Sequence, residues 1–153
     1  MKTVEIEHLI PHRGAMIFLD RVVKTDSNKI FCEFEIKPDF FLCEQGKVPA
    51  YVGVEIIAQS IAAFNGVKNY SDRYEPEIGF LLGVRKFRSQ VPYFNVGDIL
   101  NIETTVEYIE ESLCRFVGEI SIGERKVIEA LLSTFKPTPQ QLLELKEMTY
   151  DEQ

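Results

Sequence analysis

The sequence predicts an α+β domain in which an antiparallel sheet wraps around one long central helix. The run from Val52 to about Lys68 is apolar on almost every side, which is typical of a helix buried in a core. The remainder reads as strands joined by short turns, a pattern that favours an antiparallel sheet packed on that helix. At 153 residues and 45% hydrophobic content, the chain fits one domain over residues 1–153.

A short lead-in and a hairpin precede the helix. Two segments rich in Ile, Val and Phe, Met16 to Lys24 and Lys29 to Lys37, flank the turn-forming residues Thr25 to Asn28. In the second segment every other residue is apolar, and the residues between them are charged apart from Phe31, which predicts a half-buried strand. The side chains expected to face the core are Ile30, Cys32, Phe34 and Ile36.

Four further strands are predicted after the helix: Phe80 to Arg88, Asp98 to Glu110, Leu113 to Ile122 and Lys126 to Phe135. The last three are separated only by short turns, so we expect a meander. At the end, Thr138 is placed to cap a short helix, Pro139 to Met148, with Gln141 completing a capping box.

Glu55 is the one carboxylate inside the apolar helical run. An acid surrounded by apolar side chains holds its proton more readily, which suits a general acid. It lies about one turn into the helix, so the free N–H groups of the first turn could hold a carbonyl oxygen nearby. Alternatively, Glu55, Gln59 and Gly66 fall on one side of the helix and form a narrow solvated stripe.

Composition excludes several classes of protein. The three cysteines are odd in number and widely spaced, which indicates neither a disulfide framework nor a zinc site and fits a reducing cytoplasm. The N-terminal residues carry acids where a signal peptide needs an apolar core, and no run of ~18 apolar residues predicts a membrane span. A net charge of −7 makes nucleic acid an unfavourable partner.

Four segments in order resemble the β-hydroxyacyl-(acyl carrier protein) dehydratases of the hot-dog fold. Pro11-His12-Arg13 with Met16 to Val22 is similar to the PHR…LLxDRV opening of that family, and Pro49 to Gln59 to its PGxxxxExxAQ helix start. Arg85 to Arg88 and Val96 to Asp98 resemble its ARFxR and PGD segments. The PHRxxM opening and the PAxxGxE-type helix start resemble in particular the divergent dehydratases of aryl polyene biosynthesis.

The resemblance implies dehydration of a 3-hydroxyacyl thioester to the trans-2-enoyl thioester without a metal or organic cofactor. It implies Glu55 as the acid, backbone amides around Ala50, Tyr51 and Val52 as donors to the thioester oxygen, and Gln59 as a further substrate-binding residue. The catalytic histidine of the family's GHFPG segment has no counterpart in Phe40 to Lys47, and the family's glycine before the helix is Ala50 here.

The base must therefore come from elsewhere, and the sequence has only His8 and His12. The PHR loop lines the acyl pocket in the resembled fold, so His12 is the predicted base, whereas His8 is predicted to be solvated. The alternative is that His12 only hydrogen-bonds to backbone within a structural loop.

Further expectations concern partners. The acyl group arrives on acyl carrier protein or coenzyme A, and Arg85, Lys86 and Arg88 either meet an acidic carrier protein or form a solvated strand edge. A sheet with free edges predicts a homodimer or higher homo-oligomer, or a hetero-oligomer with a second hot-dog protein. Two other functions stay open: a hot-dog acyl-thioesterase, and a non-catalytic partner subunit of a hetero-oligomeric dehydratase.

Overall fold

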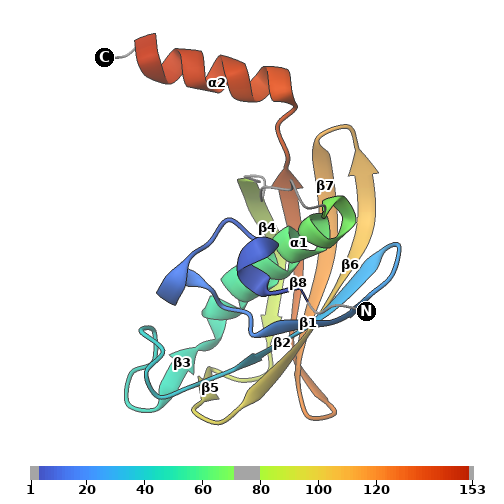
Figure 1. Cartoon of the computed structure of the whole chain (residues 1–153). Coiled ribbons are helices and arrows are strands. Elements are labelled where there is room, and N and C mark those ends of the chain that lie inside the picture. Colours follow the sequence, from blue (N-terminus) through green and yellow to red (C-terminus); the bar gives the residue numbers. More distant parts are fainter. Residues whose placement is uncertain (1–3, 71–79, 152–153) are drawn as a thin grey trace.

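The computed structural model describes residues 4–70 and 80–151 and has the hot-dog arrangement (Figure 1). Its main sheet has six strands in the order β1-β2-β6-β7-β8-β4, and every neighbouring pair is antiparallel. The strands are β1 (Arg21–Thr25), β2 (Lys29–Glu35), β6 (Ile99–Glu110), β7 (Leu113–Ile122), β8 (Arg125–Phe135) and β4 (Phe80–Ser89). The predicted antiparallel sheet is confirmed, with two of its six strands before the helix in sequence and four after it.

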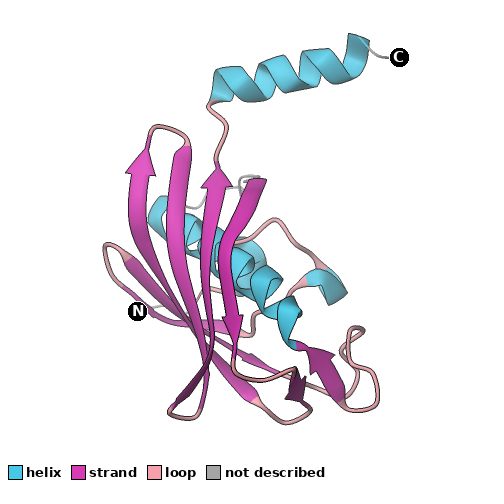
Figure 2. Cartoon of the chain, turned by 180° about the vertical axis from the view of Figure 1, so that it is seen from behind, coloured by secondary structure: helices cyan, strands magenta, loops and turns pink. Residues whose placement is uncertain are grey.

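Helix α1 (Gly53–Asn69) lies in the concave face of this sheet, and Figure 2 shows the sheet from the opposite side, in front of the helix. It begins one residue after the predicted start because a 3₁₀ turn, η3 (Ala50–Val52), precedes it. The helix packs closely on the sheet at Gly118, where an added Cβ would overlap the side chain of Ile57. This close packing fixes the depth at which the helix residues lie.

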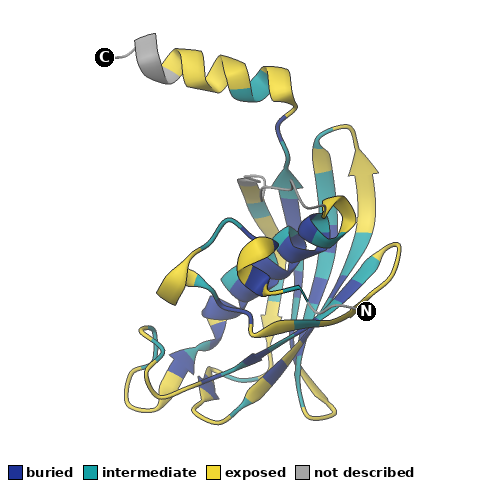
Figure 3. Cartoon of the chain, viewed as in Figure 1, coloured by how far each residue is buried: buried dark blue, intermediate teal, exposed yellow. Residues whose placement is uncertain are grey.

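The predicted alternation in β2 is confirmed, because Ile30, Cys32 and Phe34 are buried while their neighbours are half-exposed. Opposite them, β6 and β7 contribute a matching inward row that includes Leu100, Ile102 and Ile120. The register therefore places apolar side chains of three adjacent strands against α1. Figure 3 shows buried positions, in dark blue, along both the helix and the strands of the sheet.

The lead-in forms two 3₁₀ turns, η1 (Ile6–His8) and η2 (Gly14–Met16), and packs across α1. Its apolar residues Ile6, Leu9, Ile10, Phe18 and Leu19 belong to the buried core. At Gly66 an added Cβ would overlap the Leu9 carbonyl oxygen, so only glycine allows the lead-in to pass this close to the helix. The predicted strand from Met16 is wrong at its start, because β1 begins only at Arg21.

A second sheet of two short strands, β3 (Lys47–Pro49) and β5 (Tyr93–Asn95), was not predicted. It leads directly into η3, and Ala50 N–H donates to Pro92 O at 3.0 Å. Three residues per strand are too few for an alternating pattern to be recognised in sequence.

The C-terminal helix α2 (Pro139–Asp151) is capped as predicted, since Gln141 N–H donates to Thr138 Oγ1 and Thr138 N–H donates to Gln141 Oε1. It extends away from the sheet and α1 (Figures 1 and 3). Among the described residues, one segment, Ala50–Asn69, is long and apolar enough to cross a membrane by length and composition alone. Packing in the core accounts for its composition, because 61% of its most apolar window is buried in the fold.

Candidate active site

Glu55 lies in the first turn of α1 on a half-exposed stripe that continues through Ala58, Ala62 and Asn65. The other faces of the helix are covered, and Gln59 and Gly66 are buried. The alternative of a solvated Glu55–Gln59–Gly66 stripe is therefore wrong. The carboxyl of Glu55 is more open than predicted, with 42% of its side chain exposed in the isolated chain.

His12 reaches Glu55 from the loop between η1 and η2. Its Nε2 lies 3.3 Å from Glu55 Oε1, and 28% of its side chain is exposed. The loop is held by Arg13, whose guanidinium donates to Ile10 O at 2.7 Å and to His12 O at 2.6 Å. The structure thus brings together, within one chain, the two residues predicted as acid and base. His8, by contrast, is exposed.

The other ring nitrogen of His12, Nδ1, is buried and has no hydrogen-bond partner in the described part of the chain. The alternative in which His12 hydrogen-bonds to backbone is therefore wrong for the described part of the chain. Loop packing and the contact with Glu55 hold the ring, and the nitrogen that faces Glu55 is the one open to chemistry.

Gln59 fixes the position of Glu55 from one helical turn away. Its Nε2 donates to Glu55 Oε1 at 3.1 Å and to Met16 O at 2.8 Å, and its Oε1 accepts from Phe18 N–H at 2.6 Å. The side chain is fully buried and its polar atoms are engaged. The prediction that Gln59 binds substrate needs correcting: it is a positioning residue that ties the lead-in to the acid.

A cavity of about 330 Å³ begins at the His12–Glu55 pair and extends along the half-exposed stripe of α1. Its walls are mostly apolar and come from α1 and from the ends of β4, β6, β7 and β8; they include Ile61, Phe64, Leu81, Ile109 and Phe116. Cys114 also lines it, and burial raises the pKa of this thiol while the charge of Lys136 lowers it. We call this the acyl cavity.

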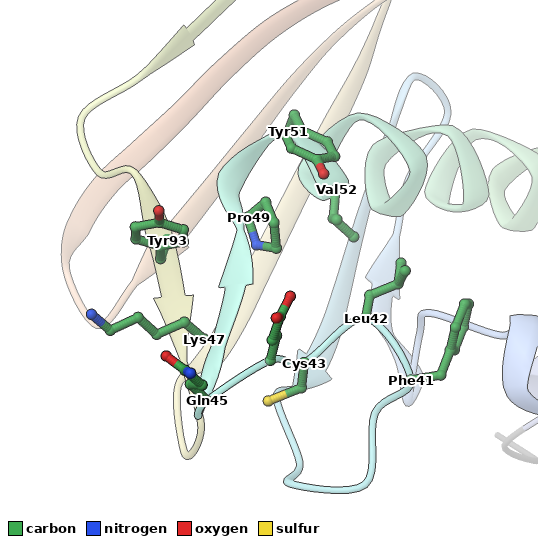
Figure 4. Close-up of a pocket in the computed structure, with 10 residues that line it drawn as sticks. Phe41, Leu42, Cys43, Gln45, Lys47, Pro49, Tyr51, Val52 and Tyr93 are labelled. Carbon is green, nitrogen blue, oxygen red and sulfur yellow. The ribbon is translucent and has the colours of Figure 1, made fainter.

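The predicted oxyanion residues lie elsewhere. Tyr51 and Val52 line a second cavity of about 480 Å³, formed by the loop before β3, by η3 and by β5 (Figure 4). We call it the loop cavity. The N–H of Ala50 is already bound to Pro92 O at 3.0 Å, so the predicted use of this amide for a thioester oxygen is wrong in this conformation. Tyr51 and Val52 belong to the 3₁₀ turn η3, and the N–H of the next residue, Gly53, donates to the carbonyl oxygens of Ala50 and Tyr51.

The three predicted carrier contacts lie on edge strand β4 and are exposed. Lys86 Nζ pairs with Glu129 at 3.2 Å, and Arg85 Nε donates to Ser133 Oγ at 3.2 Å. Lys86 and then Lys126 hold the pKa of Glu129 below its usual range. Part of the positive charge of this group is therefore balanced within the sheet, which leaves Arg88 as its most available member.

Comparison with known proteins assigns the family. Residues 4–147 match the ApeP-like family, whose members are described as ApeP dehydratase. The chain belongs to the ApeP-like dehydratase family. The hot-dog dehydratase resemblance of the sequence is thereby confirmed, together with its aryl polyene branch.

Individual relatives agree with an ApeP-like dehydratase. The 3-hydroxyacyl-[acyl-carrier-protein] dehydratase FabZ of Coxiella burnetii is 28% identical over 143 residues, which is 89% of this chain and 99% of that protein. A chain of the dehydratase heterocomplex ApeI:P from Xenorhabdus doucetiae superposes with a TM-score of 0.85 at 27% identity, covering 94% of this chain and 98% of that one. A hypothetical thioesterase protein from Streptococcus pneumoniae, with a TM-score of 0.59 and 14% identity, shares the fold alone; the alignment covers 76% of this chain and 84% of that one.

Sequence reasoning missed two features of this dehydratase site. The backbone groups of Met16 and Phe18 that bind Gln59 carry no side-chain signature, so only the structure reveals them. The Lys68 and Lys136 side chains that line the far part of the acyl cavity come from segments distant in sequence. The four-residue spacing of Glu55 and Gln59 was the available signal for their contact.

Proposed function

We propose that this ApeP-like chain dehydrates a 3-hydroxyacyl group, held as a thioester on acyl carrier protein, to the trans-2-enoyl thioester. The observation that carries the proposal is the 3.3 Å contact between the His12 imidazole and the Glu55 carboxyl at the start of an apolar cavity. The names of the FabZ relatives support this substrate class, and the ApeP-like family supports the reaction.

In the proposed reaction His12 Nε2 takes the proton from C2, and the carboxyl proton of Glu55 goes to the C3 hydroxyl. The C2–H and C3–O bonds break, the C2=C3 bond forms, and water leaves. The direct contact leaves no space for C2 and C3 between the two side chains. The substrate therefore lies beside the pair, with its hydroxyl at Glu55 Oε2, because Oε1 already faces His12 and Gln59.

After one turnover His12 carries an extra proton and Glu55 lacks one. The contact between Nε2 and Oε1 lets that proton pass directly from the imidazolium to the carboxylate. This transfer returns one proton to the Glu55 carboxyl without bulk solvent, and a half-turn of the carboxyl group about its Cγ–Cδ bond then places that proton toward the next substrate hydroxyl. Gln59 keeps Oε1 oriented for it through the 3.1 Å hydrogen bond.

The thioester oxygen needs donors as negative charge develops on it. The N–H groups of Tyr51 and Val52 are candidates, but they border the loop cavity rather than the acyl cavity. Assembly resolves this separation in our proposal. Among the described strands, edge strand β4 pairs with β8 alone, and it exposes Leu81, Leu82 and Val84. Antiparallel pairing with the β4 of a second copy, or of a second hot-dog chain, would bring the loop cavity of one chain toward the acyl cavity of the other.

The remaining partner assignments follow from charge and redox state. Arg88, with Arg85 and Lys86 nearby, offers an acidic carrier protein a local positive edge on a negative chain. All three cysteines are free, in keeping with a reducing cytoplasm. The ApeI:P heterocomplex is a precedent for association of a similar chain with a second dehydratase subunit.

The test is mass spectrometry of 3-hydroxyacyl-carrier protein incubated with the pure chain. Loss of one water from the carrier-bound acyl group is expected, and it should disappear with Glu55→Gln. Release of the free carrier thiol would instead establish a thioesterase. Lack of any reaction alone, with activity appearing only after addition of a second hot-dog subunit that retains its own catalytic pair, would favour the non-catalytic partner.

A further inference from the structure

The proposed acid and the proposed base are held in place in different ways. Glu55 lies in the first turn of α1, and its Oε1 accepts a hydrogen bond from Gln59 Nε2 at 3.1 Å. The His12 ring has no comparable support, because its buried Nδ1 has no hydrogen-bond partner among the described residues and its Nε2 faces Glu55 itself at 3.3 Å. The direction of the ring therefore depends on the backbone of the loop that carries it.

That loop joins η1 to η2 and belongs to no helix or strand. Pro11 has no N–H to donate, so the segment has one backbone donor fewer for its own hydrogen bonds. Arg13 is extended, with φ −139° and ψ 149°, and Gly14, at φ +58°, then turns the chain into η2. A short segment of this kind needs side-chain hydrogen bonds to hold one conformation.

The guanidinium of Arg13 supplies such bonds. Its Nη1 donates to Ile10 O at 2.7 Å and to His12 O at 2.6 Å, so one nitrogen joins the carbonyl groups on either side of the Pro11–His12 segment. Hydrogen bonds from a charged donor are stronger than those between neutral groups. Ile10 is fully buried in the core, whereas His12 borders the acyl cavity. The guanidinium thus ties the backbone of His12 to a fixed part of the fold.

We propose that Arg13 is the positioning residue of the base, in that its guanidinium fixes the loop so that His12 Nε2 meets Glu55 Oε1. The inference rests on the proposed dehydration and adds a residue to its machinery. Arg13 acts through His12 and does not touch the substrate. Misplacement of a reacting group by about 1 Å can cost ~10²-fold in rate, so a bond to the backbone of the base has a large effect on turnover.

The first experiment measures dehydration of 3-hydroxyacyl-carrier protein and of the matching pantetheine thioester by Arg13→Ala. Its kcat should fall by about 10- to 100-fold on both substrates while KM stays within about threefold, because the groups that bind the ground state are intact. Methylguanidinium added to Arg13→Ala should restore part of the lost kcat, and Arg13→Lys should be intermediate. Arg21→Ala is the matched control: Arg21 is also exposed and pairs with Glu33 at 2.9 Å, and its loss should leave kcat unchanged.

A double-variant cycle separates positioning from a general structural role. In the His12→Ala background, Arg13→Ala should lower kcat no further, because the residue that it positions is gone. Multiplicative losses in the double variant, or no rescue by methylguanidinium, would overturn the proposal. A rise in KM for the carrier-bound substrate alone, with kcat unchanged, would instead make Arg13 a contact of the carrier protein.

Failure of the dehydratase function is distinguishable, since it would appear as no water loss from either substrate in the wild-type chain. The positioning role is then tested by acylation with diethyl pyrocarbonate, followed by mass spectrometry of peptides. The sequence has only two histidines, and exposed His8 is the internal reference. Arg13→Ala should raise the rate of acylation of His12 relative to His8, and methylguanidinium should reverse the rise. An unchanged ratio of the two rates would show that Arg13 does not hold the ring.

Discussion

The two cavities that border the start of α1 differ in the chemistry that they offer. The acyl cavity has the His12–Glu55 pair and apolar walls, while the loop cavity is lined by Tyr51, Tyr93 and the segment from Phe41 to Gln45, with no histidine. In the resembled dehydratases the base belongs to the segment before the helix. Here that segment forms the loop cavity, and the only imidazole near the acid comes from the lead-in. The acid keeps its place in the helix while the proposed base comes from another part of the chain.

The largest expected effect comes from removing either member of the His12–Glu55 pair, which tests whether the acyl cavity is the catalytic one. Glu55→Gln and His12→Ala should each lower kcat for dehydration by ~10²–10⁴-fold, because each removes a proton-transfer group. The double variant should be little worse than either single variant, since the two groups act as a unit. Circular dichroism should show intact folding. Full activity in His12→Ala would show that His12 is not the base. The thioesterase and partner-subunit functions would then be favoured instead.

A second prediction concerns how the lead-in is attached. Gln59→Leu leaves Phe18 N–H and Met16 C=O without their partner, so the free energy of unfolding should fall by about 2–6 kcal/mol, from roughly 1–3 kcal/mol for each buried group. Urea denaturation measures it. The same change at exposed Gln90 is the control and should alter stability by less than about 0.5 kcal/mol. If Gln59→Leu lowered stability as little as Gln90→Leu, the apolar residues of the lead-in alone would hold it in place.

The cysteines report which cavity binds the acyl chain. Cys114 lines the acyl cavity and Cys43 the loop cavity. An inert alkyl pantetheine at ten times its Kd should slow alkylation of Cys114 by about tenfold and leave Cys43 almost unaffected. Cys32 should react least, because burial raises the pKa of its thiol to about 12. Mass spectrometry of labelled peptides separates the three. Protection of Cys43 instead would move the acyl chain to the loop cavity.

The smallest expected effect is at Ala50. Glycine there restores the residue of the resembled family, yet the Ala50 N–H is bound to Pro92 O. Ala50→Gly should therefore change kcat/KM by less than about twofold and lower stability by roughly 0.5–1 kcal/mol through backbone entropy. A rise in kcat of tenfold or more would show that this amide does serve the thioester oxygen.

Much of the fold was predictable because it depends on patterns of short range. The alternation of Ile30, Cys32 and Phe34 determined the inward face of β2, and the apolar run after Pro49 identified α1. The capping box at Thr138 located the start of α2. Each of these signals lies within one element, so the sequence contains it whole. The strands of the small sheet, at three residues each, were too short to give one.

The site was predictable only in part because its parts meet through the tertiary fold. His12 and Glu55 were named from resemblance and from the scarcity of histidine, and their contact was then found within one chain. The role of Gln59 could not be read from sequence, since its partners are backbone groups of the lead-in. The hydrogen bond from the Ala50 N–H to Pro92 O could not be predicted either, because nothing in the sequence indicates that these two residues lie side by side.

Attachment of the lead-in through Gln59 and Gly66 also bears on the order of folding. The hydrogen bonds from Gln59 to the lead-in span 41 and 43 residues of sequence, whereas the hairpins of β6, β7 and β8 join neighbours. Contacts that close long loops tend to form late. A folding chain can thus complete its sheet and central helix while the segment that carries His12 is still undocked. On refolding, we expect catalytic activity to return after the far-ultraviolet signal of secondary structure.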